Sequence, residues 1–192
     1  MTGRTHDLAA FTALNLVFIT ETAPPDISFA TLAAAVGANM IGGLLPDIDD
    51  ATSDIWDKVR GGSLLGKLIK PLVGQHRMLS HSIVGMVIIG FLSEWFLNWL
   101  GSIVLVNMNI IWWALMIGYF SHLVTDSLTK QGVPWLFPIP IRFGFPPFEF
   151  MRIKTGGIIE KSLVFPGLIL LNAYWIYANY QHYIIFLKRY LE

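Results

Sequence analysis

The sequence predicts an all-α fold: a polytopic membrane helix bundle of four to five helices with two cytoplasmic loops. Hydrophobic residues make up 54% of the 192 residues, whereas charged residues make up 14%. This excess of apolar over charged residues is typical of membrane proteins. The apolar residues also fall in long runs that two polar stretches interrupt. We therefore expect residues 1–192 to form a single membrane-embedded domain.

The apolar runs define the expected helices in chain order. The first run has the length of a signal peptide, but Pro24 and Pro25 crowd the candidate cleavage bond, which favours an uncleaved helix. In the second run Ala34, Ala38 and Gly42 recur every four residues and form a small face that a neighbouring helix can approach closely. The expected helical segments are 6–20, 27–45, 79–106, 110–128 and 162–187, the last of which either spans the membrane or lies along its interface.

The loop charges predict the orientation of the bundle. Loops 47–75 and 130–161 carry most of the lysines and arginines, whereas the connections at 21–28 and 107–109 carry none. The positive-inside rule then places the N-terminus and both long loops in the cytoplasm. The second long loop is rich in phenylalanine and proline, a composition that suits a segment lying in the membrane interface.

Histidines and aspartates occur where these helices begin or end on the cytoplasmic side. His122 and Asp126 are four residues apart and therefore share one helical face. His81 lies at a corner before the third long run, with Ser80 or Ser82 near the helix cap. We expect the Asp47-x-Asp49 pair after a proline to be extended. The candidate metal ligands are His6, Asp47, Asp49, His76, His81, His122 and Asp126.

A mixed set of histidines and carboxylates predicts a divalent metal site. The chain has no cysteine, so every ligand must be a nitrogen or an oxygen atom. Such a set suits zinc first, and manganese or iron as alternatives, with one or two ions in a catalytic site that keeps open positions. Asp49 or Glu160 could activate water, although Glu160 could instead be a ligand or the acid of a helix N-terminus. Arg77 could bind an anionic group through two hydrogen bonds.

The motifs together resemble the YdjM-like family of bacterial inner-membrane proteins, which are described as metal-dependent hydrolases. The resemblance implies hydrolase activity and a bacterial inner-membrane location. Gly157 stands where many members have serine, a departure that leaves the ligand set unchanged. The motifs are Leu44-Leu45-Pro46-Asp47-Ile48-Asp49, His76-Arg77, Ser80-His81-Ser82, Gly118-Tyr119, Ser121-His122, Asp126, Thr129 to Pro138, and Thr155-Gly156-Gly157 followed by Glu160.

Two functions follow from this site. The first is metal-dependent hydrolysis, at the cytoplasmic leaflet, of a phosphoester in a lipid or a membrane-proximal substrate. The second is a membrane protein that binds or transports a divalent metal without hydrolase activity. Transport would place the ligands near the middle of the membrane at broken helices. Their positions at the ends of the spans favour the hydrolase. Membrane lipid is the expected partner, and the zero formal net charge gives no indication of a nucleic-acid partner.

Overall fold

The computed structural model describes residues 1–21, 25–49, 78–139, 141–188 and 190. Within these residues the chain is helical and has no strand, only isolated β-bridges between Thr129 and Ile153 and between Val133 and Phe143. The all-α prediction is therefore confirmed for the described part of the chain. The elements are α1 (Gly3–Thr20), α2 (Phe29–Gly42), η1 (Leu45–Asp49), α5 (Ile83–Leu100), α6 (Met108–Ser127), η2 (Glu149–Met151), η3 (Glu160–Val164), α7 (Phe165–Ala178) and α8 (Tyr180–Lys188).

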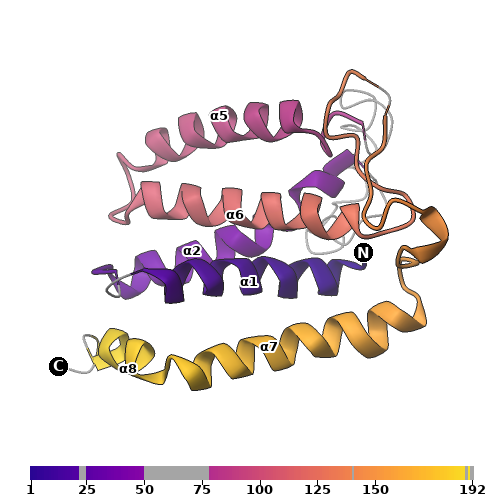
Figure 1. Ribbon diagram of the computed structural model, residues 1–192. Coiled ribbons are helices and arrows are strands. Elements are labelled where there is room, and N and C mark those ends of the chain that lie inside the picture. Colours follow the sequence, from indigo (N-terminus) through magenta and orange to yellow (C-terminus); the bar gives the residue numbers. More distant parts are fainter. Residues whose placement is uncertain (22–24, 50–77, 140, 189, 191–192) are drawn as a thin grey trace.

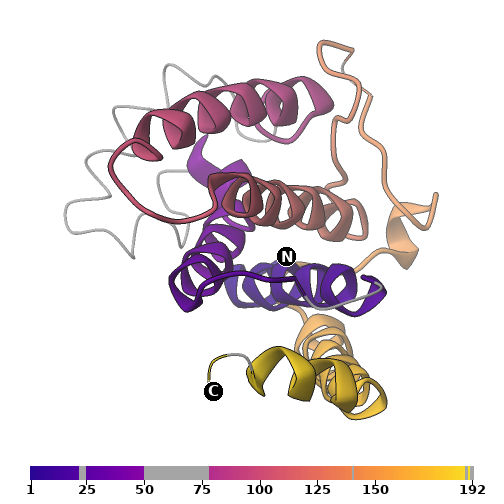
Figure 2. The same ribbon diagram turned by 90° about the vertical axis from the view of Figure 1, so that its left-hand side faces the viewer.

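Successive long helices run in opposite directions, so alternate helix ends gather at two ends of the bundle (Figure 1). The N-terminus, the end of α2, the start of α5, the end of α6 and the start of α7 lie at one end, which we call the site end. The α5–α6 turn and α8 lie at the other end. Helix α6 is central, between α5 on one side and α1 on the other (Figure 2).

Two described helices, α5 and α6, are long and apolar enough to cross a membrane, whereas α2 is apolar but has 14 residues. The predicted total of four to five spans therefore stays a prediction. Large apolar side chains nevertheless cover the outside of the bundle, including Trp95 at 72% exposure and Leu170 at 69%. Histidine, aspartate, asparagine and threonine side chains are buried inside. This inverted distribution is typical of a protein surrounded by lipid.

The helix ends differ from the predicted ends in ways that local chemistry explains. Ser28 caps α2, because its side-chain oxygen accepts a hydrogen bond from the Thr31 backbone N–H at 3.1 Å. The prediction that Asp47 lies in an extended segment is wrong, since η1 is a 3-10 helix in which the Asp47 N–H donates to the Leu44 carbonyl at 3.1 Å. Pro46 favours this turn because its fixed φ of about −65° matches 3-10 geometry.

Glycines allow α2 and α6 to pack at the distance of backbone contact. A Cβ atom at Gly42 would lie 2.0 Å from the Leu115 carbonyl oxygen, and one at Gly118 would lie 2.1 Å from the Asn39 carbonyl oxygen. The Asn39 side chain also donates to the Ala114 carbonyl at 3.0 Å. The small face predicted on α2 is thus the face that packs against α6, as expected where small residues and polar side chains hold helices together in membranes.

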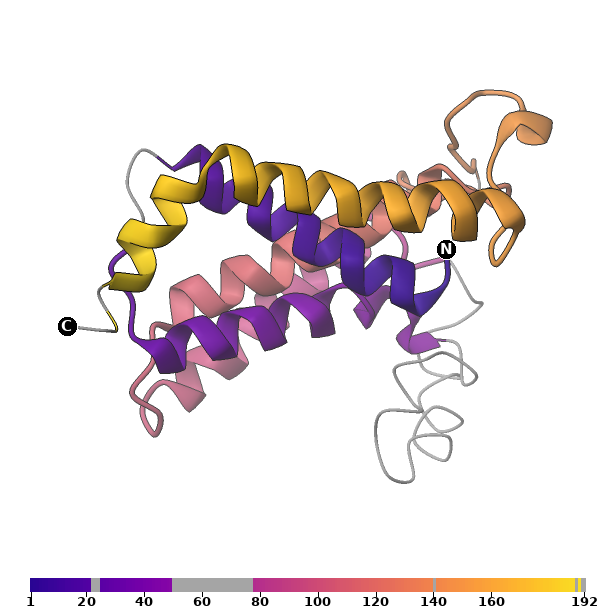
Figure 3. The same ribbon diagram turned by 90° about the horizontal axis from the view of Figure 1, so that it is seen from below.

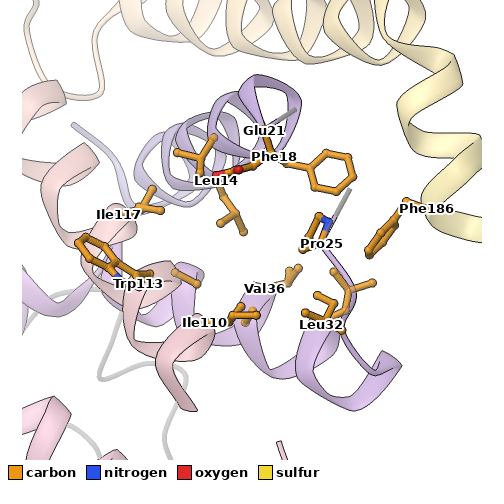
Figure 4. A pocket seen from close by; sticks show the side chains of 14 residues that line it. Leu14, Phe18, Glu21, Pro25, Leu32, Val36, Ile110, Trp113, Ile117 and Phe186 are labelled. Carbon is orange, nitrogen blue, oxygen red and sulfur yellow. The ribbon is translucent and has the colours of Figure 1, made fainter. Parts of the chain in front are cut away.

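Helices α1 and α2 are close at the site end and diverge toward the other end (Figure 3). A Cβ atom at Gly43 would lie 2.9 Å from the Ala10 Cβ atom. At the far end the helices enclose a pocket of about 570 Å³, with α6 and α8 completing its walls (Figure 4). Its described lining residues are apolar except Glu21. The divergence therefore leaves polar groups concentrated at the site end and apolar space at the other.

The second long loop forms a lobe attached to the end of α6, described at residues 129–139 and 141–159. Val133 and Phe143 exchange backbone hydrogen bonds of 2.8 and 2.9 Å, and the Arg152 side chain donates to the Pro146 and Pro147 carbonyls at 2.7 Å. Three phenylalanines of the lobe are more than half exposed: Phe145, Phe148 and Phe150. The lobe lies at the site end of the bundle (Figure 1), so these phenylalanines give that end exposed apolar side chains.

Candidate metal centre

Five of the predicted ligands meet in a buried cluster at the site end. The three histidines and Asp126 are fully buried, and the Asp47 side chain is 19% exposed. They belong to two overlapping triads, one of His6, Asp47 and His122 and the other of His81, His122 and Asp126, and the donor atoms in each triad lie within 4.8 Å of one another. His122 is common to both. The cluster draws on α1, η1, the turn before α5, and α6.

The separations between donor atoms match the edges of a metal coordination shell. His122 Nε2 lies 3.2 Å from His81 Nε2, and His6 Nε2 lies 3.2 Å from Asp126 Oδ1. Asp47 Oδ1 lies 3.3 Å from His81 Nε2 and 3.6 Å from His122 Nε2. A tetrahedral ion with bonds of about 2.0–2.1 Å holds neighbouring nitrogen atoms about 3.3–3.4 Å apart. The donors of each triad therefore already lie near the spacing that one bound ion requires.

The contacts of His122 fix which of its ring nitrogens carries the proton. Its Nδ1 atom lies 2.7 Å from the carbonyl oxygen of Gly43. A carbonyl oxygen can only accept, so Nδ1 must donate and Nε2 of the neutral ring keeps its lone pair. This lone pair faces the cluster. The close α2–α6 packing makes the contact possible, because it brings the end of α2 against the last turns of α6.

The same argument applies to His6. Its Nδ1 atom lies 3.0 Å from Thr125 Oγ1, whose single proton is directed to the carbonyls of Ser121 at 2.9 Å and His122 at 3.0 Å. Thr125 Oγ1 must then accept from His6, which leaves the His6 Nε2 lone pair facing Asp126. The His6 ring also stacks on the His122 ring, with centroids 3.7 Å apart and planes 11° from parallel.

His81 is oriented by the corner that leads into α5. Its Nδ1 atom lies 3.1 Å from Ser80 Oγ, and the Tyr119 hydroxyl donates to the Ser80 carbonyl. Ser82 caps α5 by accepting from the Gly85 N–H at 3.0 Å, as the sequence predicted for this pair of serines. A Cβ atom at Gly85 would lie 2.0 Å from the Leu79 carbonyl oxygen, so glycine is required for this tight corner.

The arrangement fits a divalent cation. Lone pairs of two imidazole nitrogens and the oxygens of two carboxylates face one another in a buried space, where uncompensated charge costs several kcal/mol. The amino group of Met1 donates to Asp126 Oδ1, which satisfies one of these oxygens. Among the residues that the structure describes, His6 Nε2 has no hydrogen-bond partner although it is fully buried. A metal ion would satisfy these donors together, and nitrogen and oxygen donors suit zinc, manganese or iron.

The electrostatics of Asp47 favour the ionised form that a metal ligand needs. Burial raises the pKa of Asp47, but the hydrogen bond with His81 and the Coulombic interactions with His122, His81 and His6 outweigh burial. The net effect holds this pKa well below its usual range. Asp47 is therefore a carboxylate at neutral pH.

Glu160 does not belong to the ligand cluster. Its Oε1 atom accepts hydrogen bonds of 2.7 Å from the Thr2 N–H, the Thr2 hydroxyl and the Thr5 hydroxyl, and its Oε2 atom accepts one of 2.8 Å from the Gly156 N–H. Burial raises the pKa of Glu160, but these hydrogen bonds lower it to about 2. An ionised Glu160 thus holds the start of α1.

The remaining predicted site residues fall at or beyond the limits of the described chain. Asp49 is the last residue of η1, and its side chain lies outside what the structure describes. His76 and Arg77 also lie outside the described residues. Sequence reasoning missed Thr125 and the Gly43 carbonyl. Thr125 lies three residues after His122, a position from which a hydroxyl could have been expected to reach the same region, whereas a backbone carbonyl leaves no signal in the sequence.

Comparison with known proteins supports the resemblance found in the motifs. The family model described as YdjM inner membrane protein matches residues 1–185, a range that contains all five clustered donors and Glu160. A protein of Bacillus subtilis (strain 168) named "Uncharacterized protein YvsG" is 33% identical over 181 residues, which cover 94% of this chain and 98% of that protein. No solved structure matches the chain.

Proposed function

Because the chain belongs to the YdjM inner membrane protein family, we propose that it is a membrane-bound hydrolase that uses one or two divalent metal ions to cleave a phosphoester at the cytoplasmic leaflet. The observation that carries this proposal is the buried cluster of three histidines and two aspartates. Buried ionisable clusters in membrane proteins are costly and usually functional. The donors lie near helix ends rather than at a break within a helix, which favours the hydrolase over metal transport.

Each residue has a proposed role. His6, Asp47, His81, His122 and Asp126 would hold the metal, zinc in the first instance. A divalent ion in such a site polarises an ester oxygen and makes a water molecule a stronger nucleophile at neutral pH. Glu160 already accepts four hydrogen bonds, so we assign the general base to Asp49 rather than to Glu160.

We propose that the substrate is a lipid phosphate or another anion at the depth of the lipid head groups. The lobe offers exposed phenylalanines beside the site end, which suits contact with acyl chains. Arg77 and Arg142 are the arginines assigned to the anionic group. Arg152 is not assigned to the anionic group, because its guanidinium donates to the Pro146 and Pro147 carbonyls. Its role is therefore to shape the lobe.

The same proposal includes a multi-pass topology with the site facing the cytoplasm. The helices α5 and α6 are each long and apolar enough to cross a membrane, which supports at least two crossings. The lobe carries Lys130, Arg142 and Lys154 on its surface, whereas the α5–α6 turn carries no lysine or arginine. This charge difference supports a cytoplasmic site end.

The test is an activity assay on detergent-solubilised protein with zinc, manganese or iron added to separate samples. Substrates are phospholipids, prenyl phosphates and soluble phosphodiesters. We expect metal-dependent turnover of a lipid phosphate, lost in His122→Ala and kept in His182→Ala, a histidine that packs against Phe18 away from the site. Turnover of the soluble esters alone would contradict the lipid substrate. Metal uptake into vesicles without turnover of any ester would favour the transport alternative.

A further inference from the structure

We infer that Glu160 is a positioning residue of the metal centre, which fastens the first turn of α1 so that His6 reaches Asp126 and His122. The inference rests on the proposed metal centre. Glu160 is 1% exposed and lies at the first position of η3, far along the chain from the two threonines it binds. Three of its four hydrogen bonds go to Thr2 and Thr5. Thr5 is the residue directly before His6.

Helix α1 has no N-cap side chain of its own that could fasten its first turn. Thr2 occupies the N-cap position, but its side chain makes no capping hydrogen bond, and the first turn contains no acidic residue. The first N–H groups of a helix have no partner within the helix, and a negative charge near them is stabilising. Glu160 supplies both an acceptor and a negative charge from another part of the chain, because its carboxylate accepts a hydrogen bond from the Thr2 N–H at this helix end.

The consequence for the metal centre follows from how His6 is held. Its ring must stay stacked on the His122 ring while Nε2 points to Asp126 Oδ1 at 3.2 Å. His6 lies in the first turn of α1, where helices fray most readily. Fraying there would move this nitrogen away from the other donors. A carboxylate that holds Thr2 and Thr5 together prevents that movement without touching the metal.

The chain offers a matched control for this role. Asn172 of α7 is also buried and also ties the last helical segment to α1, through hydrogen bonds with Asn15 at 2.9 Å and Thr12 at 2.7 Å. Asn15 lies nine residues beyond His6, about 13 Å along the helix. If Glu160 served only to dock the last segment onto α1, losing Asn172 would have the same effect on the centre as losing Glu160.

The experiment compares Glu160→Gln and Asn172→Leu in the purified full chain. Glutamine keeps the shape of the side chain, but its amide nitrogen is a donor and must face either the threonine donors or the Gly156 N–H. Zinc affinity is measured by competition with a chromophoric chelator, and the ligand set by the absorption spectrum of the cobalt-loaded protein. Hydrogen exchange of residues 3–9 is measured without metal.

We expect Glu160→Gln to lower zinc affinity by roughly 10- to 100-fold, the usual effect of losing a group that orients a ligand. Exchange in the first turn of α1 should rise, and Asn172→Leu should change neither quantity. Thr5→Val removes one hydrogen-bond donor and keeps the carboxylate, so it should lower zinc affinity less than Glu160→Gln does. It replaces Glu160→Gln as the test if the glutamine variant does not insert into the membrane. The positioning role would be overturned if Glu160→Gln and Thr5→Val both kept the wild-type zinc affinity. An equal loss of zinc affinity in Asn172→Leu would also overturn it. A wild type that binds no metal would instead refute the proposed function, and the exchange data would still show whether Glu160 holds α1.

Discussion

Replacing His122 with alanine should weaken metal binding more than replacing any other ligand. His122 is the one residue that belongs to both donor triads, and it stacks on the His6 ring. Its loss therefore removes a donor from each triad and also leaves His6 without that contact. By contrast, Asp47→Ala leaves the triad of His81, His122 and Asp126 intact.

The expected size of the effect comes from the energetics of zinc sites. Zinc binding to small four-ligand sites has an apparent free energy of about 10–16 kcal/mol at neutral pH, or roughly 2.5–4 kcal/mol for each ligand. Losing one ligand then corresponds to a decrease in affinity of roughly 10²- to 10³-fold. We expect His122→Ala to lie at the upper end of this range and Asp47→Ala at the lower end.

The assay is metal content by mass spectrometry after dialysis against graded concentrations of a chelator, for protein loaded with zinc, manganese or iron. His182→Ala is the control for loss of a histidine outside the cluster. Circular dichroism in detergent checks that each variant is still helical. If His122→Ala retained wild-type affinity while folded, or if the wild type took up none of the three metals, the cluster would not be a metal site.

Three further predictions follow from the fold. A cysteine at Thr155 should resist an impermeant thiol reagent in intact cells and react after lysis. A cysteine at Ser102, in the α5–α6 turn, should react in intact cells and after lysis; the opposite pattern would mean that the topology is reversed. The pKa of Glu160 falls from 4.5 to about 2 on folding, so its contribution to stability is full above pH 4.5 and is lost as the pH falls toward 2. The difference in unfolding free energy between wild type and Glu160→Gln should therefore shrink as the pH falls from 4.5 toward 2. A constant difference would show that ionised Glu160 does not stabilise the fold. Gly118→Val should lower both thermal stability and metal affinity, because its side chain would meet the backbone of α2. A Cβ atom at Gly167 would have no described atom within 4 Å, so Gly167→Val should change neither.

The sequence predicted that the ligands converge, because successive spans run in opposite directions and the loop charges decide on which side of the membrane each helix end lies. Once the N-terminus and both long loops are placed on one side, His6, Asp47, His81, His122 and Asp126 must lie at the same end of the bundle, and the structure brings them together. The i, i+4 spacing of His122 and Asp126 was sufficient to place both on one face of α6.

Other features depend on packing that has no local signature. Asp47 was predicted in an extended segment because a proline follows the helix, but η1 continues the chain as a tighter helix. The orientation of His122 depends on the Gly43 carbonyl, and every residue has a carbonyl. Glu160 binds Thr2 and Thr5 across sequence separations of 158 and 155 residues, so only the packed bundle shows that its carboxylate contacts the start of α1.

The last prediction is that metal binding stabilises the folded bundle. The five donors come from separate segments and are close together only when α1, α2, α5 and α6 are packed, so the folded state should bind the ion far more tightly than the unfolded chain. At a free metal concentration 100 times the Kd, this preference adds about 2.7 kcal/mol to the free energy of unfolding. Thermal unfolding in detergent should therefore move to higher temperature with added zinc in the wild type and in His182→Ala, and the shift should be largely absent in His122→Ala. Chelation should reverse it. An equal shift in His122→Ala would mean that the stabilising ion binds elsewhere on the protein.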